Sequence, residues 1–277
     1  MLHQVEFKQA VEDFEFILKF ADKNQDELDL LANSIDFIDQ FSEKYNQSIV
    51  FAFDEFGDIE KLNGGEIVKL FRSKIQLQKH SSYIFSGSQE SLMEKIFITS
   101  KSPFYRFAKV IQLNEIDAGI FKKFIKKEFK KIDVFINDDA LHILLNFTKG
   151  HPYYTQLICR QMEFEFSDVS DKTIGNKEIY MAIENAYWSE INYIEKLWQE
   201  LSAVREQLEI VIAIAQGITS LYNTLDLNKL NVSRALRNLR IKGIIKKENK
   251  VNILRDPMLK FFIRKEVLKW DLKQCIV

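Results

Sequence analysis

The segment Ser48–Phe53 constrains the fold of this chain more than any other feature. It reads Ser-Ile-Val-Phe-Ala-Phe, and two adjacent carboxylates, Asp54 and Glu55, follow it directly. Continuous apolar runs of this length are typical of parallel strands that are buried on both faces. Because functional polar groups gather where such strands end, the pattern predicts an open α/β sheet with a site beside Asp54 and Glu55.

An acid pair at the end of a buried strand is typical of a Walker B segment. The first carboxylate, here Asp54, would hold Mg²⁺ through water, and the second, here Glu55, would polarise the water that attacks a γ-phosphate. The loop that normally cradles the phosphates, G-x-x-x-x-G-K-[ST], does not occur in the 277-residue sequence. These residues therefore make half of a nucleotide site. Taken alone, the acid pair is equally consistent with a solvated loop start.

Composition narrows the class of protein. Hydrophobic residues make up 46% of the chain and charged residues 29%, with a formal net charge of −1. These values are ordinary for a soluble globular protein and give no overall attraction to nucleic acid. No apolar run approaches the roughly 20 residues of a membrane-spanning helix, and the N-terminus does not resemble a signal peptide, so we expect a cytoplasmic protein. Cys159 and Cys275 lie far apart, which fits a reducing compartment and argues against a zinc site.

The N-terminal part follows a strand-and-helix rhythm. Apolar residues predict a helix, a strand, a helix and two further strands, over 26–45, 49–53, 66–78, 83–85 and 109–113. Such an order is typical of a parallel sheet with right-handed crossovers. We therefore assign residues 1–115 to an α/β core with a partial parallel sheet.

Two further parts follow the sheet. Residues 116–195 are predicted to form a helical lid, because 116–190 contains helical patterns only. In residues 196–277, helical stretches lead to a helix over 232–242 and then a strand pair over 244–247 and 251–255. That order predicts a C-terminal winged helix-turn-helix.

Four short motifs, in order, resemble the archaeal-type ATPase family of the AAA+/STAND branch of P-loop NTPases. The similarity extends from about residue 20 to about residue 267 and includes Asp256-Pro257, which these proteins carry after their winged helix. The resemblance implies ATP and Mg²⁺ as cofactors and a nucleotide-driven switch. The motifs are Phe53-Asp54-Glu55-Phe56, Tyr83-Ile84-Phe85-Ser86-Gly87-Ser88, Ser102-Pro103-Phe104-Tyr105 and Gly150-His151-Pro152-Tyr153-Tyr154.

The resemblance assigns roles to individual residues. Asp54 matches the magnesium-side Walker B acid and Glu55 the catalytic glutamate. Ser86 or Ser88 lies where a sensor residue reads the γ-phosphate. Arg106 falls at the glycine position of the family's P-F-Y-G-R motif, next to the position of its arginine.

The Gly150-His151-Pro152 turn is similar to the G-x-P element that STAND ATPases place against the adenine. A structural interpretation accounts for two of its residues as well. Gly150 would cap the preceding helix in a left-handed conformation, and Pro152 would begin the next helix at its first turn.

The N-terminus departs most from the family. In these ATPases the P-loop strand precedes the region where this sequence starts, and it lies between the strands that match 83–86 and 109–113. Only a short amphipathic segment, Val5–Phe20, stands before the helix at Asp26. We therefore expect open strand edges and negligible ATP hydrolysis by this chain alone.

Three explanations of this departure stay open. The chain is a truncated P-loop ATPase, a non-catalytic DNA-binding or adaptor protein derived from one, or a chain that receives its P-loop from a separate polypeptide. A homo-oligomer is a further expectation for its partners.

Basic residues cluster in the predicted winged helix. Between residues 234 and 255, eight lysines and arginines stand against one acid, Glu248. Helical spacing turns several polar side chains outward, where a recognition helix meets DNA. A protein-docking or autoinhibitory module is the alternative. The candidate DNA contacts are Ser233, Arg234, Arg237, Arg240, Lys246 and Lys247.

Overall fold

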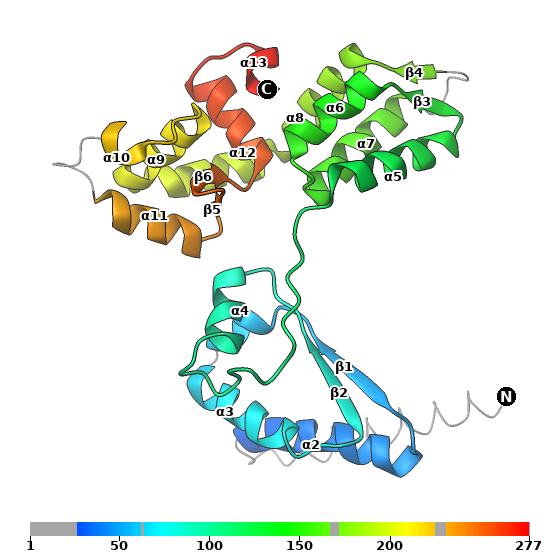
Figure 1. Ribbon diagram of the computed structural model, residues 1–277, viewed down its shortest axis with the longest axis vertical. Helices are drawn as coiled ribbons and strands as arrows, with labels where there is room; N and C mark the ends of the chain where they lie inside the picture. The colour runs from blue at the N-terminus through cyan, green and yellow to red at the C-terminus, as the bar shows by residue number, and fades with distance from the viewer. Residues whose placement is uncertain (1–26, 62–63, 167–171, 225–230, 277) are drawn as a thin grey trace. The chain divides into compact units, whose positions relative to one another are not determined.

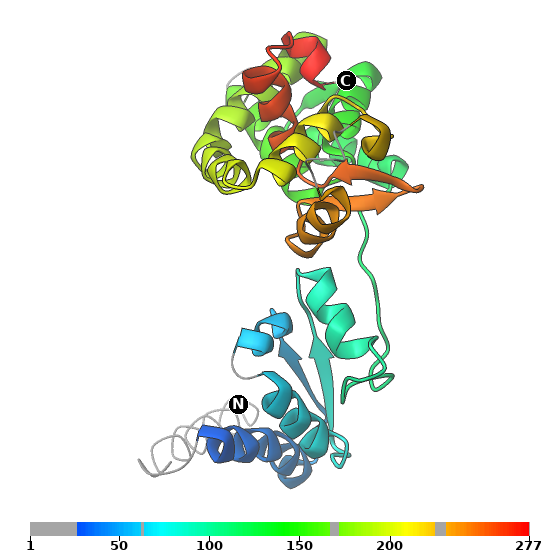
Figure 2. The same ribbon diagram turned by 90° about the vertical axis from the view of Figure 1, so that its left-hand side faces the viewer.

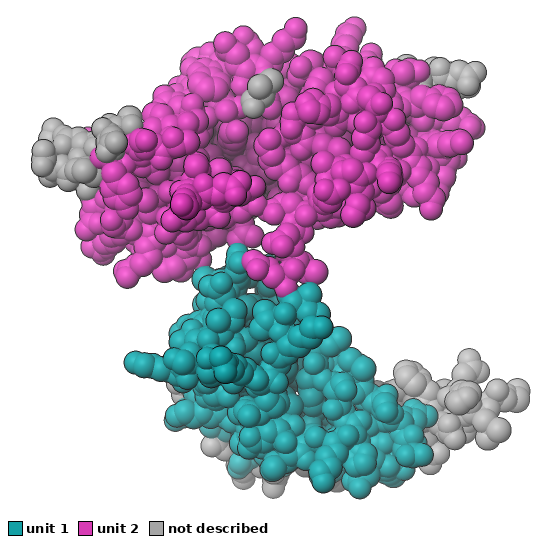
Figure 3. All heavy atoms as spheres, in the orientation of Figure 1, with its two compact units in different colours: residues 1–111 teal, residues 112–277 magenta. Residues whose placement is uncertain are grey.

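The computed structural model describes residues 27–61, 64–166, 172–224 and 231–276. The predicted amphipathic segment Val5–Phe20 lies outside them. The chain divides into two compact units, Met1–Ile111 and Gln112–Val277, which Figure 3 colours separately. Each unit has a hydrophobic core of its own. The division into three parts at 115 and 195 stays a prediction.

Unit 1 contains a two-stranded parallel sheet with helices (Figure 1). The predicted order of helix, strand, helix and strand is confirmed, and so is the parallel pairing, with Ile49 opposite Ser81 and Phe53 opposite Phe85. The elements are α2 (Glu27–Tyr45), β1 (Ile49–Phe53), the 3-10 helix η1 (Phe56–Lys61), α3 (Gly64–Ile75), β2 (Ser81–Phe85) and α4 (Glu90–Phe97).

Aromatic rings fill the core of unit 1. Phe53 of β1 and Phe85 of β2 stack with centroids 5.6 Å apart, and Phe104 is fully buried against Phe85. Alternate strand residues face the other side of the sheet. There Val50 and Ile84 are 62% and 53% exposed. The sheet of unit 1 therefore has one covered face and one exposed apolar face.

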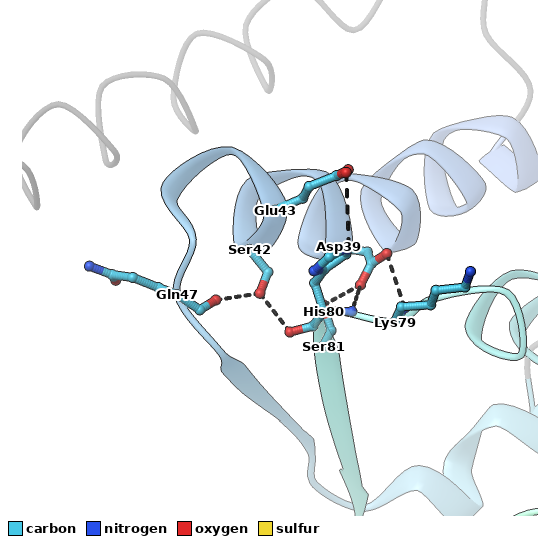
Figure 4. Close-up of polar contacts among 7 residues, drawn as sticks. All are labelled: Asp39, Ser42, Glu43, Gln47, Lys79, His80 and Ser81. Atoms are coloured by element: carbon cyan, nitrogen blue, oxygen red, sulfur yellow. Dashed lines mark hydrogen bonds and ion pairs between the residues drawn. The ribbon is translucent and has the colours of Figure 1, made fainter.

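The end of α2 is tied to the start of β2 by polar contacts (Figure 4). The Asp39 carboxylate accepts hydrogen bonds from His80 N at 2.8 Å and from Ser81 Oγ at 3.0 Å. Ser42 Oγ donates to His80 O at 2.6 Å. Burial raises the pKa of Asp39, but the hydrogen bonds from His80, Ser81 and Lys79 bring that pKa below its ordinary value. The carboxylate thus fixes where β2 begins.

The third strand predicted over Lys109–Leu113 is wrong. These residues are in no strand, and Val110, Ile111 and Leu113 are 55%, 71% and 91% exposed. A strand requires a neighbour to complete its hydrogen bonds. Within the described part of unit 1, β2 pairs with β1 only. Apolar β-type residues alone did not suffice to make a strand here.

Unit 2 begins with helices and a short sheet. The prediction that 116–190 holds helices only is wrong, because β3 and β4 pair in parallel, with Val134 opposite Lys172 and Ile136 opposite Ile174. Strands of three residues are too short to show an alternating pattern. The elements are α5 (Ala118–Lys130), β3 (Val134–Ile136), α6 (Asp138–Thr148), α7 (Pro152–Phe166), β4 (Lys172–Ile174) and α8 (Asn176–Ser202).

The C-terminal elements of unit 2 follow the predicted order of helices and then an antiparallel strand pair. Figure 2 shows α11 beside the β5–β6 hairpin, in which Ile245 lies opposite Leu254. The long helix α8 packs on α6, α7, α9 and α12, so it joins the two halves of this unit. The elements are α9 (Arg205–Ala215), α10 (Leu221–Thr224), α11 (Val232–Ile241), β5 (Ile245–Glu248), β6 (Val251–Leu254), α12 (Pro257–Phe262), the π-helix η2 (Ile263–Val267) and α13 (Leu272–Ile276).

Within the described ranges, no helix combines the length and the apolar character that crossing a bilayer requires. Cys159 and Cys275 are free thiols.

Candidate functional site

The carboxyl ends of β1 and β2 bring four predicted site residues together. Ser86 Oγ donates a hydrogen bond to Asp54 Oδ1 at 2.7 Å. Ser88 donates to Glu55 Oε2 through its hydroxyl at 3.0 Å and through its backbone N–H at 3.1 Å. Because Phe53 lies opposite Phe85, the residues that follow them emerge at the same sheet edge. Each acid is thus held by a serine from the neighbouring strand end.

Backbone hydrogen bonds stabilise this edge. Ser86 N donates to Phe53 O at 2.9 Å, and Phe56 N donates to Ser86 O at 2.8 Å. Glu55 has a φ of 48°, in the left-handed region that residues with side chains rarely adopt. Strained backbone of this kind persists only where its surroundings fix it, and it is enriched at functional sites. The carbonyl oxygen of Glu55 accepts a hydrogen bond from Asp58 N at 2.9 Å, and η1 begins at the residue after Glu55.

Asp54 is suited to a divalent cation. Its carboxylate is solvent-exposed, and the hydrogen bond from Ser86, followed by that from Glu55 N–H, lowers its pKa. The group is therefore ionised at neutral pH. Mg²⁺ prefers hard oxygen ligands and commonly takes only one or two carboxylates together with water and phosphate oxygens. A single exposed carboxylate such as Asp54 suits this partly hydrated kind of site. In the described ranges no cluster of three His, Cys, Asp or Glu side chains is placed to hold a metal.

Arg106 contacts a different part of unit 1. The Arg106 guanidinium lies 5.2 Å from the Tyr105 ring centroid, and the backbone N–H of Arg106 donates to Phe97 O at 3.4 Å. Phe107, at the position of the family's arginine, packs under the guanidinium of Arg72 at 3.8 Å. The role of Arg106 stays a prediction.

The Gly150-His151-Pro152 turn belongs to unit 2, between α6 and α7. Gly150 has a φ of 76°, and a Cβ there would lie 2.5 Å from Ile116 O. Its own carbonyl accepts a hydrogen bond from Ile116 N at 3.2 Å, while Pro152 begins α7. The close approach of Gly150 to Ile116 and the start of α7 at Pro152 therefore give both residues a structural role. An adenine contact stays a prediction.

His151 is the chemically distinctive residue of this turn. Its Nδ1 atom is buried without a hydrogen-bond partner among the described residues. Burial lowers the pKa of His151, and this outweighs the opposite effect of Asp256 and Glu115. The imidazole is therefore biased toward its neutral form, and no described residue makes a hydrogen bond to its Nδ1 atom.

Nothing in the sequence predicted a cavity beside His151, and no motif singled out Glu190 or Tyr193. A cavity of about 320 Å³ is lined by His151, Tyr153, Tyr154, Glu190, Tyr193 and Asp256. Tyr153 OH donates to Glu190 Oε1, and Tyr154 OH donates to Asp256 Oδ2, each at 2.7 Å. The two acids lie 37 and 102 residues along the chain from these tyrosines. No local pattern marks such a cluster, because only the packing of α7 and α12 on α8 creates it.

The outer face of α11 carries the predicted basic cluster. The positions that helical spacing turns inward, Val232, Ala235, Leu236 and Leu239, are buried. The candidate DNA contacts of this helix are exposed: Ser233, Arg234, Arg237 and Arg240.

Several of these candidates have partners within the unit. Ser233 shares a hydrogen bond with Tyr222 at 3.1 Å, and Arg240 donates to Asn252 Oδ1 at 2.7 Å. Lys246 is ion-paired with Glu115 and lies 3.7 Å from Glu248, whereas Lys247 is exposed. The pairing with Glu115 partly neutralises Lys246, and the sequence gives no signal of it.

Comparison with known proteins identifies the fold. Sequence comparison finds no matching family model and no matching curated protein. The structure is similar to the Walker-type ATPase PABY2304 of Pyrococcus abyssi, with a TM-score of 0.65 and 16% identity over 90% of this chain and 74% of that chain. The chain has the fold of a Walker-type ATPase. The RuvB Holliday junction branch migration motor of Thermotoga maritima also matches, at a TM-score of 0.42 and 17% identity over 80% of this chain and 70% of that chain.

The comparison confirms the broader prediction of a P-loop ATPase fold with an α/β core. The comparison does not test the archaeal-type family, the STAND branch, the lid or the winged helix, and these stay predictions. The fold gives the acid pair its context, since Asp54 and Glu55 lie at the carboxyl end of a parallel strand.

Replacing Gly150 by alanine is expected to destabilise unit 2 more than replacing Gly217. Both glycines have positive φ, but a Cβ at Gly217 meets nothing within 4 Å. Gly217→Ala should cost about 1–2 kcal/mol for the left-handed conformation, and Gly150→Ala about 1–3 kcal/mol more for the overlap with Ile116 O. Urea unfolding followed by tryptophan fluorescence measures this, because Trp188, Trp198 and Trp270 all lie in unit 2. Equal costs for the two variants would contradict the close approach.

Proposed function

We propose that this chain is part of an ATP- and Mg²⁺-dependent molecular switch of the AAA+/STAND type, which works with a phosphate-binding loop not present in its sequence. The observation that carries the proposal is the pairing of Asp54 with Ser86 and of Glu55 with Ser88 at the carboxyl ends of β1 and β2. The Walker-type ATPase fold supports the same assignment.

The proposed roles follow from the geometry of the acids. Asp54, whose pKa the hydrogen bond from Ser86 lowers, would hold a magnesium ion, and that ion would supply charge neutralisation at the phosphates. Glu55 orients the attacking water, and its strained backbone and two hydrogen bonds from Ser88 limit its freedom. Ser86 and Ser88 report the state of the γ-phosphate, because any movement of the acids changes their hydrogen bonds.

The phosphate-binding loop decides whether the switch hydrolyses ATP. Phosphoryl transfer depends mainly on positioning and electrostatic stabilisation, to which loop amides and a lysine contribute. Since the sequence has no such motif, we propose that the chain alone does not hydrolyse ATP. A complementing polypeptide or an oligomer would supply the loop. The α5–α8 region would act as the lid and the α9–β6 region as a winged helix, in a cytoplasmic protein.

Titration of the full chain with fluorescent ATP, with and without Mg²⁺, tests this dependence on an added loop. We expect no saturable binding at micromolar nucleotide, because the N–H groups that normally hold phosphates are missing. Asp54→Ala and the wild type should therefore behave alike. Tight, magnesium-dependent binding that Asp54→Ala abolishes would show that the chain already contains a complete site and would contradict the proposal.

DNA binding by a non-catalytic adaptor is the second candidate function. The observation in its favour is the exposed face of α11, where Arg234 and Arg237 point outward over a buried apolar face. Recognition helices present such a face to phosphates and bases. A protein surface of opposite charge would fit the same face.

Removing Arg234 and Arg237 together is expected to weaken DNA binding. Each lost phosphate contact should reduce the slope of log affinity against log salt by about 1. Fluorescence anisotropy with a labelled duplex at several salt concentrations measures this. Arg160→Ala with Lys196→Ala, which removes two exposed cations from α7 and α8, is the charge-matched control. A wild type whose binding is absent, or unchanged in the double variant, would exclude this face as a DNA contact.

A further inference from the structure

Unit 2 contains an aromatic cage that already holds a cation. The Nζ atom of Lys265 lies 5.2 Å from the Tyr187 ring centroid, 5.3 Å from that of Trp188 and 5.6 Å from that of Phe261. The same ammonium is ion-paired with Glu184. Attraction between a cation and aromatic faces is strongest where the cation is partly desolvated. This part of the chain thus uses aromatic rings and a carboxylate on α8 to bind positive charge.

The cavity beside His151 repeats that composition further along α8. Glu190 and Tyr193 of α8 line it together with Tyr153 and Tyr154 of α7, with Asp256 at the start of α12. Within the described part of the chain, the lining includes carboxylates and rings but no lysine or arginine. It is therefore an acidic, ring-lined cavity with no cation of its own in its wall.

Hydrogen bonds fix the orientation of this wall. The hydroxyls of Tyr153 and Tyr154 donate to Glu190 and Asp256. Asp256 Oδ1 also accepts from Met258 N at 2.8 Å and Leu259 N at 3.0 Å, so this acid is largely committed to the start of α12. A carboxylate has about four acceptor positions. Glu190 therefore keeps capacity for a ligand in addition to its bond from Tyr153.

The charge balance of the cavity favours a cation. The hydrogen bond to Glu190 raises the pKa of Tyr153, and burial together with Asp256 raises that of Tyr154, so both phenols stay neutral. His151 is biased toward its neutral form by burial. The positive charges of Arg255 and Lys246 lie close enough to lower the pKa of His151 further. Lys246 is itself paired with Glu115.

We propose that this cavity binds a guanidinium group. A guanidinium is planar, so it can stack on an exposed tyrosine ring while its N–H groups bond a carboxylate edge. Tyr153 and Tyr193, which are 51% and 54% exposed, offer the rings, and Glu190 offers the carboxylate. The proposal uses none of the residues at the ends of β1 and β2. His151, which also lines the cavity, belongs to the turn predicted to contact adenine, so the adenosine arm below distinguishes the two ligands.

Ligand-observed NMR titration of the full chain tests the proposal with N-acetylarginine amide as the probe. We expect saturable binding of this compound and none of N-acetylcitrulline amide, which has nearly the same shape but no charge. Glu190→Gln and Tyr193→Leu should each weaken binding by about fivefold or more. Tyr193→Phe, which keeps the ring, should retain binding. Glu195→Gln changes the net charge equally at an exposed position on the same helix, and it should have no effect.

A further titration identifies the source of the guanidinium. Tighter binding of an arginine-containing tripeptide would identify a polypeptide as the source, and equal binding would identify a free small molecule.

Equal binding of the arginine and citrulline compounds would overturn the proposal. So would arginine binding that Glu190→Gln and Tyr193→Leu leave unchanged in variants whose tryptophan-monitored unfolding matches the wild type. Binding of adenosine at these residues, without binding of the arginine compound, would assign the cavity to a nucleobase instead.

Discussion

The hydrogen-bonded register between β1 and β2 is the constraint on which the candidate nucleotide site depends. Pairing of Phe53 with Phe85 brings the two strand ends level, so that Asp54 meets Ser86 and Glu55 meets Ser88. A slip of one residue by either strand would turn the ring of that strand, Phe53 or Phe85, away from the core. The packing of these rings and the chemistry of the acids are therefore set by the same register.

Local patterns in the sequence predicted the parts of the fold that carry strong periodic signals. Continuous apolar residues predicted β1, and helical spacing predicted α2 and the buried face of α11. The same reasoning failed for 109–113, where an apolar run has no strand beside it in the described part of unit 1. It failed again for β3 and β4, whose three-residue strands leave too little pattern to detect.

Some residues of the candidate sites could be predicted from the sequence, and others could not. Asp54, Glu55, Ser86 and Ser88 were predictable because two consecutive strands place their ends together. The Glu115–Lys246 pair and the cavity beside His151 were not, because their members are distant in sequence and meet only through the packing of unit 2. In that unit α8 has the central position, since it supplies acids and rings both to the Lys265 cage and to the neighbouring cavity.

The central claim is that the ends of β1 and β2 form the metal side of a nucleotide site. Paramagnetic broadening of backbone amide signals by Mn²⁺, a stand-in for Mg²⁺, tests it most directly. We predict broadening centred on residues 54–56 and 86–88, lost in Asp54→Asn and kept in Asp58→Asn, which removes a neighbouring acid. Broadening centred on another acidic surface, or unchanged by Asp54→Asn, would contradict it.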